Sequence, residues 1–291
     1  MSGLRFSKGH GLGNDYLVVE RRALPWPLTD ARVRWLCDRH RGIGSDGILI
    51  VDTEKRPFEL RIRNPDGSEA EKSGNGLRIL AAWLHGRGLV RTGEEFEVAL
   101  VKDTVRMRVE AEGDEGVLDI VVDMGRASFR AEDVGFTEAT GDVLDHPLGL
   151  SATISARINT VSLGNPHCVV FVDTLDRDDF LLRAPQLCTH PAFAAGTNVQ
   201  FARVAGPARI EAWIWERGAG ETLASGSSAC AVACAAVRRG LLAGGVVEVV
   251  MVGGTAQVKV SPLFEVRLRG PAQIVVHGEI AEGGMETLRT S

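Results

Sequence analysis

The chain alternates between short runs of apolar, β-branched residues and breaks that contain glycine, proline or aspartate. Runs of this kind, rich in Val and Ile, predict β-strands. In the first half of the chain they fall at 16–20, 47–51, 59–62, 105–110 and 117–122. In the second half they fall at 168–172, 199–202, 210–215, 246–252, 257–260, 265–268 and 273–277. The pattern therefore predicts a protein built mainly from strands.

Three segments carry helix signals. Thr29 can cap a helix that runs to Asp38, with Asp30 in its first turn. Two more helices are predicted over roughly 75–87 and 227–239. Each of them follows a turn that contains glycine and ends at Arg-Gly-Leu, which places a cation in the last turn and a glycine at the C-cap.

The two later helices are apolar on most of their faces. Leu77, Leu80 and Leu84 repeat at helical spacing, and Trp83 occupies another face. Segment 229–237 contains only Ala, Cys and Val. A helix that is apolar on most faces needs cover on most faces, and a curved sheet wrapped around each helix would supply that cover.

The two halves of the chain match each other when Ser225 is placed over Ser73. The Ser-Gly that opens each helix and the Arg-Gly-Leu that closes it then coincide. Upstream, Gly-Ser-Asp at 44–46 coincides with Gly-Thr-Asn at 196–198. Matched segments in one order predict an internal duplication with a domain-sized period, and therefore two similar α/β domains rather than a solenoid.

Length, charge and cysteine usage narrow the class of protein. The 291 residues agree with two domains, and the net charge of −5 argues against a nucleic-acid or membrane-binding surface. No apolar run reaches the length of a membrane span. The five cysteines form no CxxC pair and follow no signal peptide, which predicts a reduced, cytoplasmic protein.

Both repeated helices open with Ser-Gly, at Ser73-Gly74 and Ser225-Gly226. The free N–H groups and the partial positive charge of a helix N-terminus suit an anion such as a carboxylate. Ordinary capping by serine explains either helix taken alone. Two such helices related by duplication favour a shared binding site between the domains.

Polar loops hold further candidate residues. Glu216 and Arg217 end an apolar strand and look more like part of a site than a solvated rim. His167, in Gly-Asn-Pro-His, is either a general base or a hydrogen-bonded core histidine. Pro-Asp-Gly at 65–67 is a strong turn signal. The asparagines of the neighbouring loops can bind carboxylate and amino groups through their amides.

Several motif templates are absent from the sequence. It has no Walker A loop, no HExxH, no GxSxG and no GxGxxG that opens a helix after a strand. The lysines lie in no recognisable pyridoxal-phosphate context, and no metal-ligand spacing occurs. We therefore expect a mechanism that uses neither a cofactor nor a metal.

Over nearly its whole length the chain resembles the diaminopimelate epimerase family. The resemblance rests on six motifs in a fixed order, which makes it specific. They are GHGLGNDYLVV (9–19), GIGSDGILIV (42–51), NPDGSEAEKSGNGLR (64–78), GNPH (164–167), GTNV (196–199) and ERGAGETLASGSSACA (216–231).

The resemblance implies an α+β fold of two homologous, pseudo-symmetric domains. Each would be a barrel-like, mostly antiparallel sheet around a central helix. The first domain is expected over residues 1–127 and the second over 128–272. A last strand at about 273–284 is expected to return to the first domain. A homodimer is the assembly that the resemblance suggests.

In this family two cysteines face the Cα of an amino acid from opposite sides; one removes a proton as a thiolate and the other returns one. The matching positions here are Ser73 and Ser225. A thiol has a pKa of about 8.5, whereas a hydroxyl is a far weaker acid that needs an adjacent base. The resemblance gives His167 and Glu216 supporting catalytic roles. The chain as written is expected to be inactive or slow, although ligand binding can survive.

The implied substrate is diaminopimelate, interconverted between its LL and meso forms in lysine and peptidoglycan precursor biosynthesis. The resemblance assigns side-chain contacts with this amino acid to Asn14, Asn64, Asn165, Asn198, Glu216 and Arg217. The backbone at Gly74-Asn75 and Gly226-Ser227 would hold the carboxylate of the reacting end. Where the family often has Gln, this chain has Gly47.

Two alternatives stay open. One is a related cofactor-independent amino-acid racemase or a hydroxyproline-type dehydratase. The other is a catalytically inactive paralogue that only binds an amino acid. The origin of Ser73 and Ser225 also stays open, since they are either substitutions introduced to trap a complex or natural variation.

Overall fold

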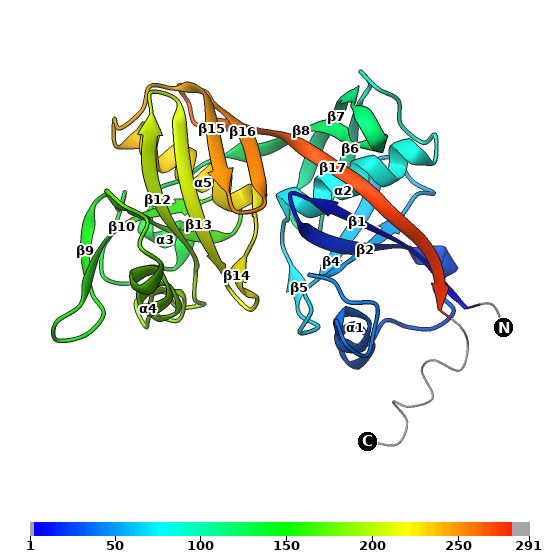
Figure 1. The fold of residues 1–291 in the computed structure, drawn as a ribbon, viewed down its shortest axis with the longest axis horizontal. Helices are drawn as coiled ribbons and strands as arrows, with labels where there is room; N and C mark the ends of the chain where they lie inside the picture. The colour runs from blue at the N-terminus through cyan, green and yellow to red at the C-terminus, as the bar shows by residue number, and fades with distance from the viewer. Residues whose placement is uncertain (1–2, 281–291) are drawn as a thin grey trace.

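The computed structural model describes residues 3–280, which form two lobes (Figure 1). The first lobe carries helices α1 (Asp30–Cys37) and α2 (Gly74–Gly86). Its strands are β1 (Leu4–Gly11), β2 (Asn14–Glu20), β3 (Ile48–Asp52), β4 (Phe58–Arg63), β5 (Glu69–Ala70), β6 (Glu95–Ala99), β7 (Thr104–Glu112) and β8 (Leu118–Arg126).

The second lobe carries helices α3 (Ala131–Val134), α4 (Arg177–Cys188) and α5 (Gly226–Arg238). Its strands are β9 (His146–Gly149), β10 (Ser155–Ser162), β11 (Pro166–Phe171), β12 (Asn198–Gly206), β13 (Arg209–Glu216), β14 (Gly220–Thr222), β15 (Gly245–Met251) and β16 (Gly254–Val260). The last strand, β17 (Glu265–Ile280), crosses from this lobe to the first (Figure 1).

The strands of the two lobes pair in the same succession. In the first lobe β2–β3 and β4–β6 are parallel pairs, and the pairs β1–β2, β3–β4, β4–β5, β6–β7 and β7–β8 are antiparallel. In the second lobe β11–β12 and β13–β15 are parallel, and β10–β11, β12–β13, β13–β14, β15–β16 and β16–β17 are antiparallel. The fold is therefore a mixed α/β arrangement with a barrel-like sheet in each lobe.

Helices α2 and α5 lie inside the curved sheets. Eleven of the thirteen residues of each helix are buried, so both helices are covered on nearly all faces, as their apolar pattern predicts. Leu77 and Leu80 of α2 and Val232 of α5 belong to one hydrophobic cluster that continues through both lobes. This shared core fixes where the two helices begin.

Strand β17 holds the lobes together. Its first half, Glu265–Ala272, pairs with β8 of the first lobe, and Val266–Arg269 also pairs with β16 of the second. Its second half, Gln273–Ile280, pairs with β1. The first lobe thus closes its sheet with a strand that follows the second lobe in the chain.

The structure corrects the sequence prediction in this region. The runs 265–268 and 273–277 were predicted as two strands, but they are parts of one continuous strand, because Gly270 and Pro271 stay in the ladder opposite β8. Residues 281–284 of the predicted returning strand lie outside the described residues.

All three predicted helices are present, with ends shifted by one residue. Thr29 caps α1, and its Oγ1 accepts a hydrogen bond from the Arg32 backbone N–H at 3.4 Å. Helix α4 was not predicted. Its sequence contains Pro185 and several charged residues, and only one side of it, including Phe180 and Leu187, is buried.

Candidate active site

The N-termini of α2 and α5 meet where the two lobes join. A Cβ atom placed on Gly74 would lie 3.0 Å from Cα of Gly226, so the close approach of the two helices requires glycine at this point. The N–H groups of a first helical turn have no partner within their own helix. Two partly positive helix ends therefore face one region of the molecule.

Ser73 and Ser225 are the N-caps of these helices. Ser73 Oγ accepts a hydrogen bond from the Gly76 N–H at 3.0 Å, and Ser225 Oγ accepts one from the Ser228 N–H at 3.5 Å. Each serine satisfies one N–H of its helix, which leaves the first N–H groups of each helix for a ligand.

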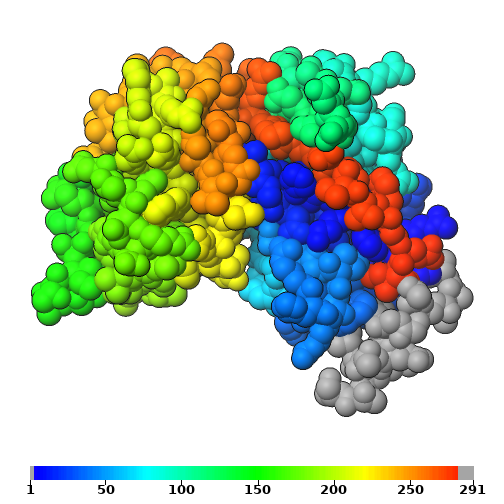
Figure 2. All heavy atoms as spheres, viewed as in Figure 1, coloured from blue at the N-terminus to red at the C-terminus, as the bar shows by residue number. Residues whose placement is uncertain are grey.

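Both serines line a cavity of about 400 Å³ that receives residues from both lobes. Figure 2 shows the lobes in contact along β16 and β17 and separating toward the lower edge of the view. Nine of the residues assigned to the site from the sequence line this cavity: Ser73, Ser225, Glu216, Asn64, Asn75, Asn165, Asn198, Arg217 and Ser227. The other four, which are Asn14, Gly74, His167 and Gly226, are buried and do not line it.

Ser73 is paired with a tyrosine. Its Oγ lies 3.2 Å from the hydroxyl oxygen of Tyr16, which also lines the cavity. Burial, and next the nearby Glu216, raise the pKa of Tyr16 far above its usual value. Tyr16 therefore stays protonated at neutral pH and does not serve as a base for Ser73. Sequence reasoning missed Tyr16, although it is the chain's single tyrosine and closely follows Asn14 in the first motif.

Ser225 lies beside a carboxyl group that titrates near neutrality. Desolvation raises the pKa of Glu216 to about 7. The neighbouring Ser225 hydroxyl opposes this rise in the pKa of Glu216, and the charge of Asp46 adds to it. At neutral pH the Glu216 carboxyl group is therefore accessible in both its protonated and its ionised form. An ionised Glu216 carboxylate has the chemistry to accept a proton from Ser225, whereas the side-chain hydrogen-bond partner of Ser73 within residues 3–280 is the phenol of Tyr16.

His167 is buried, and its ring is neutral and hydrogen-bonded at both nitrogens. Gln200 Nε2 donates to its Nδ1 at 3.1 Å, and its Nε2 donates to Asn165 Oδ1 at 3.0 Å. Desolvation, and then the charge of Arg217, lower the pKa of His167 to about 3. The ring thus orients Asn165, whose Nδ2 lies 3.4 Å from Ser227 Oγ at the start of α5. Both ring nitrogens are already occupied.

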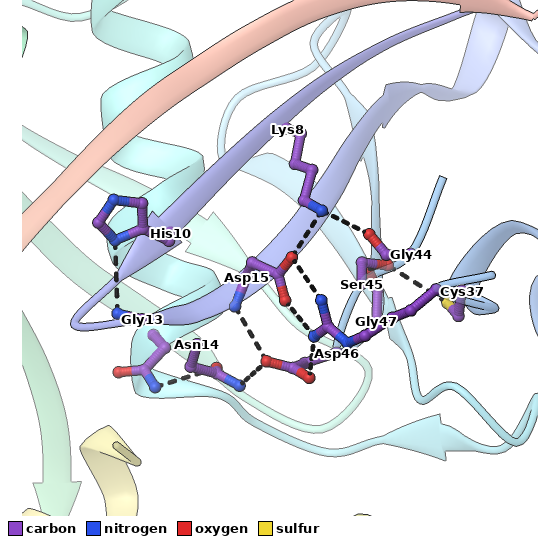
Figure 3. Close-up of polar contacts among 12 residues, drawn as sticks. Lys8, His10, Gly13, Asn14, Asp15, Cys37, Gly44, Ser45, Asp46 and Gly47 are labelled. Atoms are coloured by element: carbon purple, nitrogen blue, oxygen red, sulfur yellow. Dashed lines mark hydrogen bonds and ion pairs between the residues drawn. The ribbon is translucent and has the colours of Figure 1, made fainter. Parts of the chain in front are cut away.

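Asn14 belongs to a polar network beside the cavity (Figure 3). Its Nδ2 donates to Asp46 Oδ2 at 2.8 Å, and its Oδ1 accepts from Asn75 Nδ2 at 3.0 Å. Arg39 Nη2 donates to both Asp46 Oδ1 and Asp15 Oδ1, at 2.7 and 2.6 Å. Asp46 lines the cavity and was not assigned to the site from the sequence. Desolvation raises the pKa of its carboxyl group.

Asn198 holds the loop that follows β13. Its Oδ1 accepts from the Arg217 backbone N–H at 2.9 Å, and its Nδ2 donates to the Pro166 carbonyl at 3.1 Å. The exposed guanidinium of Arg217 donates to the Ala195 carbonyl at 2.9 Å. A planar guanidinium at the cavity edge suits a carboxylate.

Within residues 3–280, no group of three or more His, Cys, Asp or Glu side chains is placed to hold a metal ion. No helix in the same range is long and apolar enough to cross a membrane. All five cysteines are buried and free.

The fold is that of racemases and epimerases of known structure. A protein of Pseudomonas aeruginosa described as a predicted epimerase superposes with a TM-score of 0.67 at 20% identity, covering 96% of this chain and all of the other. A probable proline racemase from Agrobacterium radiobacter superposes with a TM-score of 0.72 at 14% identity, covering 98% and 95%. At these identities the likeness establishes the fold alone.

The sequence defines the family within that fold. The profile described as diaminopimelate epimerase matches residues 6–130 and 159–275. Diaminopimelate epimerase of Pelotomaculum thermopropionicum is 38% identical over 281 residues, which cover 95% of this chain and 98% of the relative. Diaminopimelate epimerase 2 of Nostoc sp. is 37% identical, covering 96% of each chain. The chain belongs to the diaminopimelate epimerase family of isomerases, and the resemblance drawn from the six motifs is confirmed.

Proposed function

We propose that this chain binds diaminopimelate between the N-termini of α2 and α5 and interconverts its LL and meso forms. The observation that carries the proposal is the placement of Ser73 and Ser225. They come from different lobes, cap two helices whose first residues touch, and line one cavity. This is the arrangement that proton exchange on two faces of one carbon needs.

The two helix ends suit the carboxylate at the reacting end of the substrate. The backbone N–H groups of Gly74 and Asn75 begin α2, and those of Gly226 and Ser227 begin α5. Asn75 and Ser227 line the cavity, and each is preceded by one of the two buried glycines. Several N–H donors aimed at one anion also stabilise the negative charge that develops when Cα loses its proton. Arg217, at the cavity edge, is placed to bind the second carboxylate of diaminopimelate.

Ser225 is the better placed of the two serines to remove a proton. Its oxygen takes the proton from Cα while its own proton passes to the Glu216 carboxylate, and the electron pair of the broken C–H bond stays on the substrate. Ser73 then donates its proton to the opposite face of Cα. Water returns a proton to Ser73 and accepts the one held by Glu216. Because a hydroxyl is a far weaker acid than a thiol, we expect this exchange to be slow.

Exchange of the Cα proton in deuterium oxide, followed by NMR with LL-diaminopimelate, tests the proposal. The chain as it stands is compared with Ser73→Cys, Ser225→Cys and the double variant. Ser261→Cys, which adds a thiol outside the cavity, is the control. We expect exchange to be fastest in the double-cysteine form. Absence of binding and of exchange in every form would refute the proposal.

Two other outcomes identify the alternatives. Binding of diaminopimelate without exchange, even in the double-cysteine form, indicates a catalytically inactive amino-acid-binding paralogue. Exchange or loss of water with proline or 4-hydroxyproline, and none with diaminopimelate, indicates a related racemase or a hydroxyproline-type dehydratase.

The identical succession of strand pairs supports a duplication origin for the two lobes. We infer that they are homologous, pseudo-symmetric domains divided at about residue 127, each with one central helix, α2 or α5. The homodimer and the cytoplasmic location suggested by the sequence belong to the same proposal. Sedimentation of the purified chain tests the dimer, and cell fractionation tests the location.

A further inference from the structure

Among residues 3–280, no carboxylate hydrogen-bonds to or forms an ion pair with Arg78, a buried cation in the second turn of α2. Its side chain is fully buried. Nη1 donates to the Gly74 carbonyl at 3.1 Å, Nη2 to Asn75 Oδ1 at 2.6 Å and Nε to the Pro271 carbonyl at 3.3 Å. All three acceptors are neutral oxygens. Burial lowers the pKa of Arg78 to about 10, so the group is still charged at neutral pH. Burying an unpaired charge is costly, so its presence needs an explanation.

Glycines from three elements leave room for this guanidinium. A Cβ on Gly11 of β1 would lie 3.0 Å from Nη2 of Arg78, and one on Gly226 of α5 would lie 3.1 Å from Nη1. A Cβ on Gly270 of β17 would lie 3.5 Å from Nε. The space for Arg78 is thus formed by β1 of the first lobe, α5 of the second and the strand that joins the lobes.

Arg78 also determines which way the amide of Asn75 points. Because Nη2 of Arg78 occupies Asn75 Oδ1, Asn75 must present Nδ2 on its other side. There Nδ2 donates to Asn14 Oδ1 at 3.0 Å and to the Ala224 carbonyl at 2.9 Å. Ala224 immediately precedes Ser225, the N-cap of α5. The side-chain amide of Asn75 in α2, held by Arg78, therefore hydrogen-bonds to the residue directly before the N-cap of α5.

We propose that Arg78 is a positioning residue for substrate binding, which fixes Asn75 so that the N-termini of α2 and α5 bind one carboxylate together. Through Asn75 it also orients Asn14 and the Asp46 carboxylate at the cavity wall (Figure 3). The inference rests on the proposed function, because it takes diaminopimelate as the ligand.

A double-mutant cycle on the full chain tests the inference. The dissociation constant of meso-diaminopimelate is measured by calorimetry for the parent, Arg78→Met, Asn75→Ala and the double variant, and the melting temperature is recorded for each. Arg87→Met is the matched control, since Arg87 is an exposed arginine at the other end of the same helix. Arg78→Lys keeps the charge but replaces the planar fork by a single ammonium group.

If Arg78 acts through Asn75, Arg78→Met and Asn75→Ala each weaken diaminopimelate binding on the order of tenfold. The double variant then has a dissociation constant no higher than that of the weaker-binding single variant. Arg78→Lys stays weakened, and Arg87→Met binds as the parent does. Multiplicative effects in the double variant, or parental affinity in Arg78→Lys, overturn the inference. If Arg78→Met does not fold, Arg78→Lys takes its place in the cycle. A parent that does not bind diaminopimelate overturns the proposed function instead.

Discussion

Replacing Gly74 by alanine should push the two helix ends apart. The added Cβ would lie 2.8 Å from Leu268 Cδ2, 3.0 Å from Gly226 Cα and 3.2 Å from the Gly226 carbonyl carbon. A leucine methyl can move by rotation, but the backbone of α5 is held in the core. Because ordinary contacts begin near 3.4 Å, the helix ends must separate by about 0.4 Å.

The expected costs follow from this displacement. Overpacking a filled core costs about 1–3 kcal/mol of unfolding free energy, which corresponds to a fall in melting temperature of roughly 2–10 °C in a chain of this size. Diaminopimelate should bind about tenfold more weakly, because the N–H donors of α2 and α5 that we propose bind one carboxylate together would move apart. Thermal unfolding and calorimetric titration measure the two effects.

A second glycine of the same helix provides the control. A Cβ on Gly86, the last residue of α2, meets nothing within 4 Å. Gly86→Ala should therefore leave binding unchanged and hold or raise the melting temperature, since alanine favours a helix over glycine by up to about 1 kcal/mol. Parental stability and affinity in Gly74→Ala would show that the contact between the helix ends does not limit the site.

Three further predictions address protonation. The parent should lose stability as the pH rises from about 4.5 to about 7, because the folded state holds the Glu216 proton more tightly than the unfolded chain does, and Glu216→Gln should abolish this loss. Melting temperatures of both proteins across this pH range check the prediction, and identical profiles count against it. The ring resonances of His167 should not titrate between pH 5 and 8, and an NMR titration with a midpoint in that range would contradict the buried neutral ring. The five native cysteines, buried and with raised pKa values, should react with a thiol reagent only on unfolding, whereas Ser73→Cys, at the cavity, should react in the folded state.

The sequence was most informative where local chemistry decides the structure. Serine followed by glycine predicted both helix starts, because a capping hydroxyl and a residue without a side chain are local requirements. The apolar character of 229–237 predicted that α5 is covered on most of its faces. Helix α4 was not predicted because it contains Pro185 and several charged residues, and because only one side of the helix is buried.

Contacts between residues that are far apart in the chain could not be predicted from the sequence. Tyr16 and Ser73 are 57 positions apart, and only the folded sheet brings their hydroxyl groups together. The residues on either side of Arg78 are apolar, but arginine side chains are usually exposed, so its burial was not predicted. The structure buries Arg78 completely. The sequence did not decide whether His167 is a general base or a hydrogen-bonded core histidine. In the structure its ring is buried and both of its nitrogens are hydrogen-bonded.

The pairing of β17 with β1 and β8 has a consequence for how the protein is made. Leu4 lies opposite Ile280, so nearly the whole chain separates the two strands. While the ribosome is still synthesising the second lobe, β1 and β8 have no partner on these edges, and unpaired edges invite association with other chains. Closing the sheet then requires a contact between two strands that are far apart in the sequence, β1 and β17, which slows folding. The lobe that is translated first is therefore the lobe that is completed last.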